Sequence, residues 1–103
     1  MHPVAPQFKR ILWYVFVATR GGPTRIKIVD MLRERPYNIN QMKTALTMDY
    51  KTIQHHIKIL EDNRIIMPEE KKYGTIYFPT GEFERAADVF SEIRGRVVTD
   101  KEE

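Results

Sequence analysis

Hydrophobic residues in the middle of the chain follow a pattern that predicts three short helices and then a β-hairpin. The clearest helix runs from Asp49 to Asn63, where Ile53, Ile57 and Leu60 recur at i, i+4 and i+7 and form one apolar face. Asp49 can accept a hydrogen bond from the free N–H groups of the first turn. We therefore predict that Asp49 is the N-cap of this helix.

Two shorter helices are predicted ahead of it. The segment Thr24–Glu34 has core-facing positions at helical spacing and stops before Pro36, because the residue that precedes a proline disfavours the helical conformation. A brief helix, Gln41–Leu46, follows, and Asn40 is its expected N-cap.

The hairpin is predicted after the third helix. Ile65–Met67 forms the first strand, and Pro68 places that strand at a sheet edge because proline has no N–H donor. Residues 69–74 form the turn, and Thr75–Phe78 returns as a second strand rich in β-branched and aromatic residues.

Each end of the chain carries one further predicted helix. Phe8–Arg20 is apolar nearly all round, so it has to be buried on several sides. Glu82–Arg94 continues towards Val97 with apolar residues at alternating spacings of three and four, which is typical of a coiled-coil contact. The polar tail, Thr99–Glu103, is expected to be disordered.

Two arrangements can cover these terminal helices. The aromatic side of the first helix can lie under the last helix of the same chain, or a second copy of the chain can cover both. We expect the second arrangement, because a small domain has difficulty covering such a helix alone. The side chains expected in the dimer interface are Phe8, Leu12, Trp13, Val17, Phe83, Phe90, Ile93 and Val97.

Length and composition describe one soluble globular unit. The chain has 103 residues, 42% of them hydrophobic and 30% charged, which suffices for a core without covalent staples. The longest apolar run, Ile11–Ala18, is too short to span a bilayer, so we expect a cytoplasmic protein with no membrane partner. We divide it into an N-terminal dimerisation helix (1–20), a central domain (21–80) and a C-terminal dimerisation helix with its tail (81–103).

Charge is distributed unevenly along the chain. The net charge is only +3, but no acidic residue occurs before Asp30 and half of the acids lie from Glu82 onward. In the helix after Asp49, donors and positive charge recur at i, i+3, i+4 and i+7 on a face without acids. A major groove offers base-edge acceptors between two phosphate rows, so such a face suits DNA, although an ordinary solvated face has the same pattern. The residues of this face are Lys51, Gln54, His55 and Lys58.

Several short motifs in the stretch from Arg25 to Tyr77 resemble those of the ArsR-like winged-helix regulators, especially the small, cysteine-free archaeal type. Each motif alone is weakly specific, but their order and spacing together are characteristic of the fold. The matching segments are Asn40-Gln41-Met42 with Ala45-Leu46, Asp49-Tyr50-Lys51-Thr52-Ile53, His56-Ile57-Lys58 with Leu60-Glu61, Ile65-Ile66, and Gly74 with Tyr77.

The resemblance implies a mainly α-helical protein with a small β-hairpin wing, namely a winged helix-turn-helix with extra N- and C-terminal helices. It implies a homodimeric transcriptional regulator that binds double-stranded DNA and responds to an unidentified small-molecule effector or to none. The implied recognition-helix contacts are Tyr50, Lys51, Thr52, Gln54, His55 and Lys58, and the implied wing contacts are Lys71, Lys72, Tyr73 and Gly74. His56, which borders the apolar face, is expected to be packed or bonded to a phosphate.

Two positions depart from the family pattern. The family usually has glycine where Thr47 and Arg64 stand, at the turn between the two helices and at the end of the recognition helix. We expect Asn63 to adopt the left-handed conformation in place of Arg64, because asparagine tolerates it better than most residues.

Metal, cofactor and enzyme chemistry are not indicated. The chain has no cysteine, its last helix has no histidine, and His55 and His56 are adjacent, so on a helix they point about 100° apart and cannot chelate together. No phosphate loop follows a strand, and no nucleophile has a recognisable partner set. The main alternative to a DNA-binding protein is a winged helix used for protein contact in a transcription-related or other complex. An RNA-binding module is a weaker alternative, since only Tyr50 and Tyr73 could stack on bases.

Overall fold

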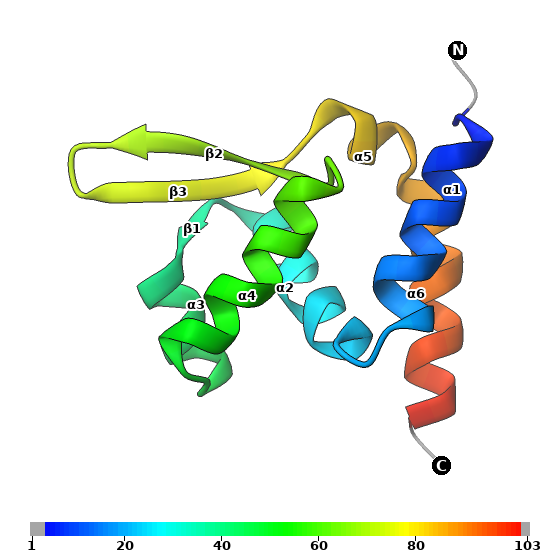
Figure 1. Cartoon of the computed structure of the whole chain (residues 1–103), viewed down its shortest axis with the longest axis horizontal. Helices are drawn as coiled ribbons and strands as arrows, with labels where there is room; N and C mark the ends of the chain where they lie inside the picture. The colour runs from blue at the N-terminus through cyan, green and yellow to red at the C-terminus, as the bar shows by residue number, and fades with distance from the viewer. Residues whose placement is uncertain (1–3, 102–103) are drawn as a thin grey trace.

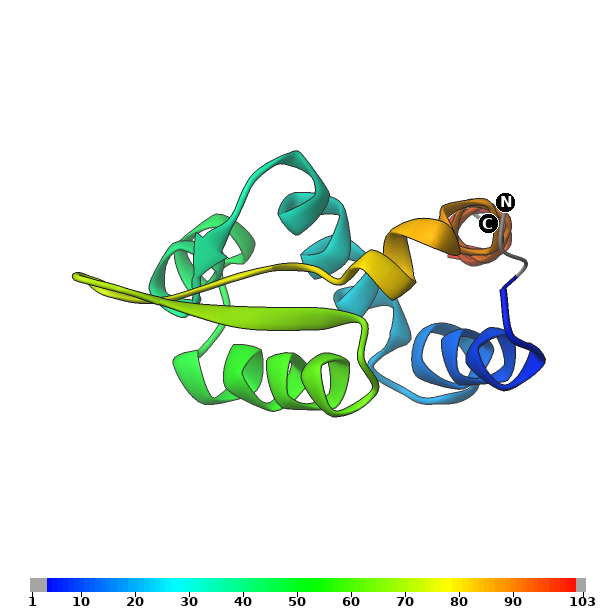
Figure 2. The same ribbon diagram turned by 90° about the horizontal axis from the view of Figure 1, so that it is seen from above.

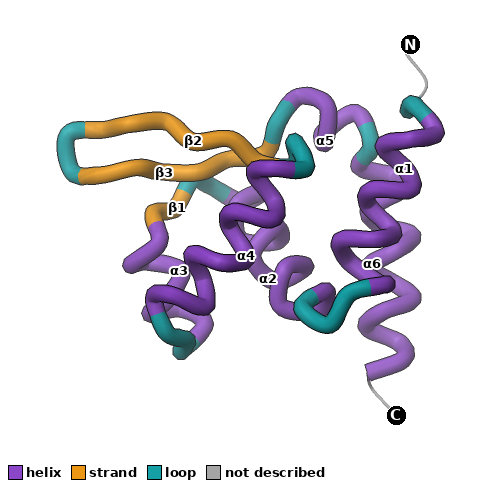
Figure 3. The backbone as a smooth tube through the Cα atoms, in the orientation of Figure 1, coloured by secondary structure: helices purple, strands orange, loops and turns teal. Residues whose placement is uncertain are grey.

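The computed structural model describes the backbone of residues 4–101 and the side chains of residues 4–97. Within these limits the chain is mainly helical with one small sheet, which confirms the predicted fold class (Figures 1 and 3). The elements, in chain order, are α1 (Pro6–Trp13), the π-helix η1 (Tyr14–Ala18), α2 (Gly22–Glu34), β1 (Tyr37–Asn38), α3 (Ile39–Leu46), α4 (Tyr50–Asp62), β2 (Ile66–Lys71), β3 (Gly74–Pro79), α5 (Gly81–Arg85) and α6 (Ala87–Lys101).

The sheet is antiparallel, with the strand order β1-β3-β2. Strand β2 lies at its edge, as Pro68 predicts, and pairs with β3 from Ile66 opposite Pro79 to Lys71 opposite Gly74. The strands are longer than the sequence indicated, so the turn of the wing is short. Gly74 has a φ of 121°, a conformation that disfavours residues with a side chain.

The wing and the terminal helices occupy opposite ends of the molecule. In Figure 1 the β2–β3 hairpin extends to the left, while α1 and α6 lie side by side at the right. Figure 2, seen from above, places α4 below the hairpin and keeps the terminal helices at the far end. A surface that contains α4 and the wing is therefore separate from a surface made by α1 and α6.

The terminal helices bury most of their apolar residues inside one chain. The Phe16 ring meets Phe90 edge-on, with 5.1 Å between ring centroids, and Phe90 meets Phe83 in the same way at 5.1 Å. The expectation that Phe83 of α5 and Phe90 of α6 face a second chain is therefore corrected, because both are covered within the same chain. The expected interface residues that lie in this core are Phe8, Leu12, Phe83, Phe90 and Ile93.

Three expected interface residues keep surface outside the core. Val17 is 45% exposed, while Trp13 and Val97 are partly buried and pack against the core cluster. Tyr14, next to Trp13, is 60% exposed. Spacing along one helix identifies an apolar stripe, but it does not say whether the same chain or another chain covers the stripe.

The predicted C-terminal helix is two helices. Ala86 has a φ of −103° and a ψ of 18°, which ends α5 and turns the chain into α6. This break interrupts the three-and-four spacing that suggested a coiled coil. The backbone is helical as far as Lys101, so the prediction of a disordered tail is wrong for residues 99–101, and residues 102–103 lie outside the described part.

Two helix starts differ from the prediction. The N-cap of α3 is Asn38 and not Asn40: its side-chain oxygen accepts from the Gln41 N–H at 2.8 Å, while the Gln41 side chain accepts from the Asn38 N–H at 2.9 Å. This reciprocal pair satisfies two free donors of the first turn. Asp49 holds the N-cap position of α4, but its side chain makes no capping hydrogen bond there.

The two positions where the family usually has glycine both adopt the left-handed conformation. Thr47 has a φ of 54° and Arg64 a φ of 61°. Asn63 has a φ of −98°, so the expectation that it would replace Arg64 in this role is wrong. For a β-branched residue such as Thr47 this conformation costs on the order of 1 kcal/mol or more.

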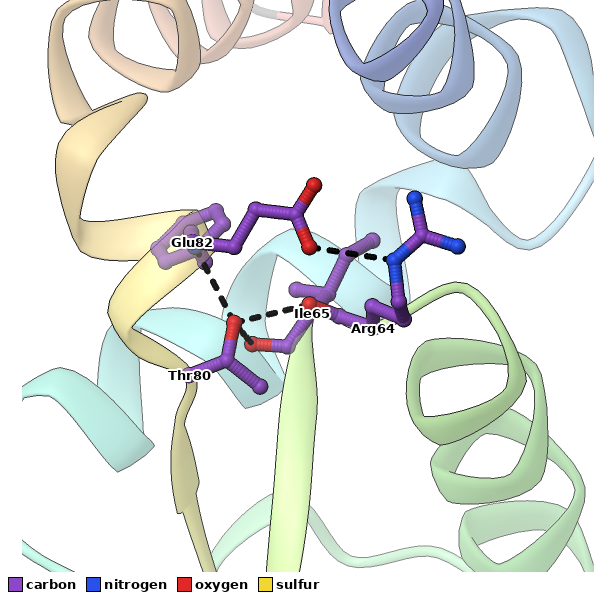
Figure 4. Close-up of polar contacts among 5 residues, drawn as sticks. Arg64, Ile65, Thr80 and Glu82 are labelled. Carbon is purple, nitrogen blue, oxygen red and sulfur yellow. Dashed lines mark hydrogen bonds and ion pairs between the residues drawn. The ribbon is translucent and has the colours of Figure 1, made fainter. Parts of the chain in front are cut away.

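Contacts around Thr80 hold the end of α4 against the start of α5 (Figure 4). The Thr80 hydroxyl donates to the Arg64 carbonyl at 2.7 Å and accepts from the Phe83 N–H at 3.0 Å. Arg64 Nε donates to Glu82 Oε1 at 3.0 Å. These bonds keep Arg64 in its left-handed conformation, because both its carbonyl and its side chain have fixed partners.

The first helix changes to a π-helix at Tyr14, so the predicted continuous helix Phe8–Arg20 is not regular throughout. The chain then turns tightly at Gly21 and Gly22. A Cβ atom at Gly22 would overlap the backbone carbonyl of Phe16, so this approach of α2 to η1 requires glycine.

The Gly22→Ala variant should lose stability, because the atoms that the new methyl group meets are backbone and cannot rotate away. We expect a loss of about 1–3 kcal/mol in the free energy of unfolding. The matched control is Gly95→Ala in α6, where a Cβ meets nothing within 4 Å. That variant should gain roughly 0.5–1 kcal/mol, since alanine is the better helix former. Denaturant titration measures both, and equal stability of Gly22→Ala and wild type would contradict the packing described.

Candidate nucleic-acid interface

Helix α4 presents two distinct faces. Ile53, Ile57 and Leu60 are buried against the core, as predicted. The opposite face is open to solvent. The exposed residues of α4 that were singled out from the sequence are Tyr50, Lys51, Thr52, Gln54, His55 and Lys58.

The charge on α4 changes along its length. Lys51 lies in the first turn, where the free backbone N–H groups also point outward. Lys58 is two turns further on, and its Nζ lies 3.3 Å from Asp62 Oδ2. Both partners of this pair are largely exposed, so the pair is weak and Lys58 remains available to a phosphate. The first turn is therefore the more strongly positive end.

The wing tip is exposed and mixed in charge. Tyr73 is 87% exposed, and Lys72 Nζ lies 5.9 Å from the centre of its ring. Lys71 Nζ lies 3.2 Å from Glu69 Oε2. Glu70 is also exposed on β2, so the positive charge of the wing is concentrated at its turn.

A groove of about 340 Å³ separates the recognition helix from the wing. It brings Tyr50 and Gln54 of α4 to the same hollow as Tyr73 and Gly74 of the wing. Polar groups predominate in the wall, and most of them are neutral donors. The lining residues are Asn38, Ile39, Asn40, Tyr50, Gln54, Tyr73, Gly74, Thr75 and Tyr77.

Five residues of this groove were not among the site residues predicted from the sequence, namely Asn38, Ile39, Asn40, Thr75 and Tyr77. They meet because β1 pairs with β3, which sets Tyr37 opposite Tyr77 and Asn38 opposite Ile76. Burial raises the pKa of Tyr77, and Glu61 and Tyr50 add to the effect, so the phenol remains a hydrogen-bond donor at neutral pH. A two-residue strand is too short to be predicted from alternation, so the sequence carried no signal for this contact.

A second hollow, of about 480 Å³, lies between the end of α2, the start of α3 and the wing tip. Arg35, Lys71 and Lys72 contribute positive charge to its wall. The Arg35 guanidinium lies 3.9 Å from the centre of the Tyr37 ring, a cation–π distance that fixes its position. Arg35 was also missed, because it stands at a helix end in a run of alternating charges.

His56 of α4 is packed inside the protein, which is one of the two environments expected for it from the sequence. It is 7% exposed, and Arg25 of α2, 2% exposed, donates from Nη1 to His56 Nδ1 at 3.0 Å. Burial lowers the pKa of His56, and the charges of Arg25 and His55 lower it further. His56 therefore does not belong to the exposed face of the recognition helix.

Within residues 4–97, no group of three histidine or acidic side chains lies close enough together to hold a metal ion. In the described part of the chain, no helix combines the length and the apolar character needed to cross a bilayer.

Residues 22–67, which span α2 to the start of β2, match the family described as "Bacterial regulatory protein, arsR family". The chain contains an ArsR-family helix-turn-helix domain. The fold of the described chain is the winged helix-turn-helix fold. The resemblance stated on the sequence motifs is confirmed at this level.

Solved structures share this fold over nearly the whole chain. Rv0081 from Mycobacterium tuberculosis has a TM-score of 0.69 at 16% identity, with 96% of this chain and 99% of that chain covered. A homodimeric winged helix-turn-helix DNA-binding domain from Mycobacterium bovis has a TM-score of 0.68 at 18% identity, with 98% and 92% covered. The transcriptional regulator HlyU from Vibrio vulnificus has a TM-score of 0.65 at 13% identity, with 87% and 84% covered. No curated protein sequence is significantly similar to the chain.

Proposed function

We propose that this protein is an ArsR-type, sequence-specific double-stranded DNA-binding transcriptional regulator that acts as a homodimer. The observation that carries the proposal is the exposed face of α4, where Lys51, Gln54 and His55 lie in the first half of the helix and the first turn after the Asp49 N-cap contains no acidic residue. Helices of this motif meet base edges in the major groove with their N-terminal half.

Different positions along α4 make different contacts, some to base edges and some to phosphates. Gln54 can make a bidentate contact to adenine, and Lys51 can reach a guanine or a phosphate from the first turn. Tyr50, Thr52 and His55 flank this contact, and Lys58 reaches the backbone alone. Base contacts specify the sequence, whereas phosphate contacts set the register of the protein on the duplex.

The wing supplies affinity to the adjacent stretch of DNA. Lys71 and Lys72 stand at the exposed turn, with Tyr73 and Gly74 beside the groove that separates the wing from α4. A phosphate row that follows this groove would meet the neutral donors Asn40 and Tyr77 as well as the lysines. This arrangement supports a wing that contacts the backbone and does not read bases.

The dimer contact is proposed on the outer face of the terminal helices, within residues 1–20 and 81–103, while residues 21–80 bind DNA. Tyr14 and Val17 are exposed there, and the Arg96 guanidinium lies 5.5 Å from the centre of the Trp13 ring. Val97 is partly buried on the same helices. The homodimeric M. bovis domain supports this proposal, and the wing at the opposite end of the fold would then point outward from both protomers. A small-molecule effector stays a prediction.

Gln54→Ala tests whether α4 reads sequence. Titrations against the duplex that the wild type prefers should show a loss of about 1–3 kcal/mol, while binding to a scrambled duplex should change little. Lys58→Ala is the comparison, because it should weaken both duplexes alike. An equal loss on both duplexes for Gln54→Ala would favour the protein-contact alternative.

Lys71→Ala combined with Lys72→Ala should weaken binding to all duplexes by a similar factor. Two fewer phosphate contacts in each protomer should also lower the slope of log affinity against log salt by about 0.9 per contact. The matched control removes the same charge from α1, with Lys9→Ala and Arg10→Ala, and should leave the slope near its wild-type value. A changed sequence preference in the wing variant would mean that the wing reads bases.

Val17→Glu tests the proposed dimer contact without disturbing the core, since Val17 is 45% exposed. Sedimentation should detect a folded monomer, because a charge would be buried without a partner in the dimer. Met67→Glu is the control, since Met67 is 42% exposed and lies on β2, away from the terminal helices. An intact dimer in Val17→Glu would place the contact elsewhere.

A further inference from the structure

Arg25 is a buried cation whose described partners include no carboxylate. Its Nε donates to the Val15 carbonyl at 3.0 Å, its Nη1 donates to His56 Nδ1 at 3.0 Å, and its Nη2 donates to the Thr19 hydroxyl. The Thr19 hydroxyl in turn donates to the Tyr14 and Val15 carbonyls, at 3.2 and 3.3 Å. The guanidinium therefore depends entirely on neutral acceptors.

These bonds join three segments that are distant in the sequence. Val15 belongs to η1 in the terminal-helix layer, Arg25 to α2 and His56 to the recognition helix α4. A Cβ at Gly21 would overlap both the Arg25 guanidinium and the His56 ring, so the loop before α2 closes over the contact. In Figure 3 this loop lies between the terminal helices and α2.

The contact fixes the protonation state of His56. Arginine is always charged and can only donate, so Nδ1 has to be the acceptor and the single proton of the neutral ring has to sit on Nε2. A second proton would occupy Nδ1. It would remove the acceptor and set two positive charges about 3.0 Å apart in a buried place.

We propose that Arg25 and His56 are positioning residues for the recognition helix, and that protonation of His56 releases α4 from Arg25 of α2 and weakens DNA binding. The DNA readout rests on the function proposed above. The release itself does not, because it is a property of the folded chain. Arg25 contacts α4 on its buried face, so neither Arg25 nor His56 needs to touch DNA.

The charges near His56 all oppose its protonation. Arg25 faces it from α2, His55 is its neighbour on α4, and burial lowers the pKa of His56 more than either. Burial lowers the pKa of Arg25, and Tyr14 of η1 acts in the opposite direction. Arg20 lies in the loop, residues 19–21, that closes over the contact. The folded state thus binds this proton less readily than the unfolded chain, whose histidine pKa is about 6.5. Stability from this contact is complete above pH 6.5 and is lost as pH falls below it.

The experiment compares two variants that share His55→Gln, so that the exposed histidine beside the DNA does not titrate in either. One keeps His56, and the other also carries His56→Gln, whose amide oxygen can accept from Arg25 at any pH. Both are measured at pH 7.5 and 5.5, for unfolding by denaturant and for affinity to the preferred duplex.

Between these pH values the unfolding equilibrium constant should rise more in the variant that keeps His56, by up to about tenfold, which is the limit for one proton with an unfolded pKa near 6.5. DNA affinity should also fall more in the same variant. Because one proton drives both changes, the factor in stability and the factor in affinity multiply to no more than about tenfold. A pH dependence of stability that is the same in both variants would overturn the switch. Equal changes in affinity, with the difference in stability present, would overturn the link to DNA.

An independent measurement uses the unmodified chain, in case His56→Gln does not fold. Nitrogen chemical shifts of the two imidazoles report which nitrogen carries the proton. Nδ1 of His56 should stay unprotonated at pH 6, with the proton on Nε2. A His56 ring that is half protonated near pH 6.5 in the folded chain would overturn the proposal. If the chain binds no DNA at any pH, the proposed function fails, and these stability and NMR results still decide whether the contact is a pH switch.

Discussion

The buried guanidinium of Arg25 is the constraint on which the arrangement of the helices depends. A charge removed from water has to keep its hydrogen bonds, and here a π-helix carbonyl, a threonine hydroxyl and an imidazole nitrogen provide them. Each acceptor comes from a different segment or from the turn between segments. The orientation of α4 relative to α2 and η1 is therefore set by one side chain as well as by apolar packing.

Local features near Arg25 follow from the same constraint. The π-helix exposes the Val15 carbonyl to a donor outside the helix, and glycine at 21 and 22 lets the chain pass close to Phe16, Arg25 and His56. The edge-on rings of Phe16, Phe83 and Phe90 join η1, α5 and α6 in the core. The exposed face of α4 and the wing then share one side of the molecule, with a groove between them.

The sequence predicted the elements well, because helical spacing and turn residues act locally. It identified the exposed face of α4 and the edge position of β2, yet it misplaced the cap of α3, since Asn38 and Asn40 are equally good caps and only the reciprocal bond with Gln41 decides between them. It could not say which chain covers Phe83 and Phe90, nor that a short strand pair would bring Tyr77 and Asn38 to the same groove. Those outcomes depend on contacts between distant segments, for which periodicity carries no information.

The central claim is that two copies of this fold read DNA with α4. Selection of bound duplexes from a random pool tests it most directly, because it presumes no site. The account predicts an enriched inverted repeat, with half-sites about one helical turn, roughly 34–36 Å, or a multiple of it apart, bound by two protomers. A pool that remains random after repeated selection, or a single unpaired motif bound by one protomer, would contradict it.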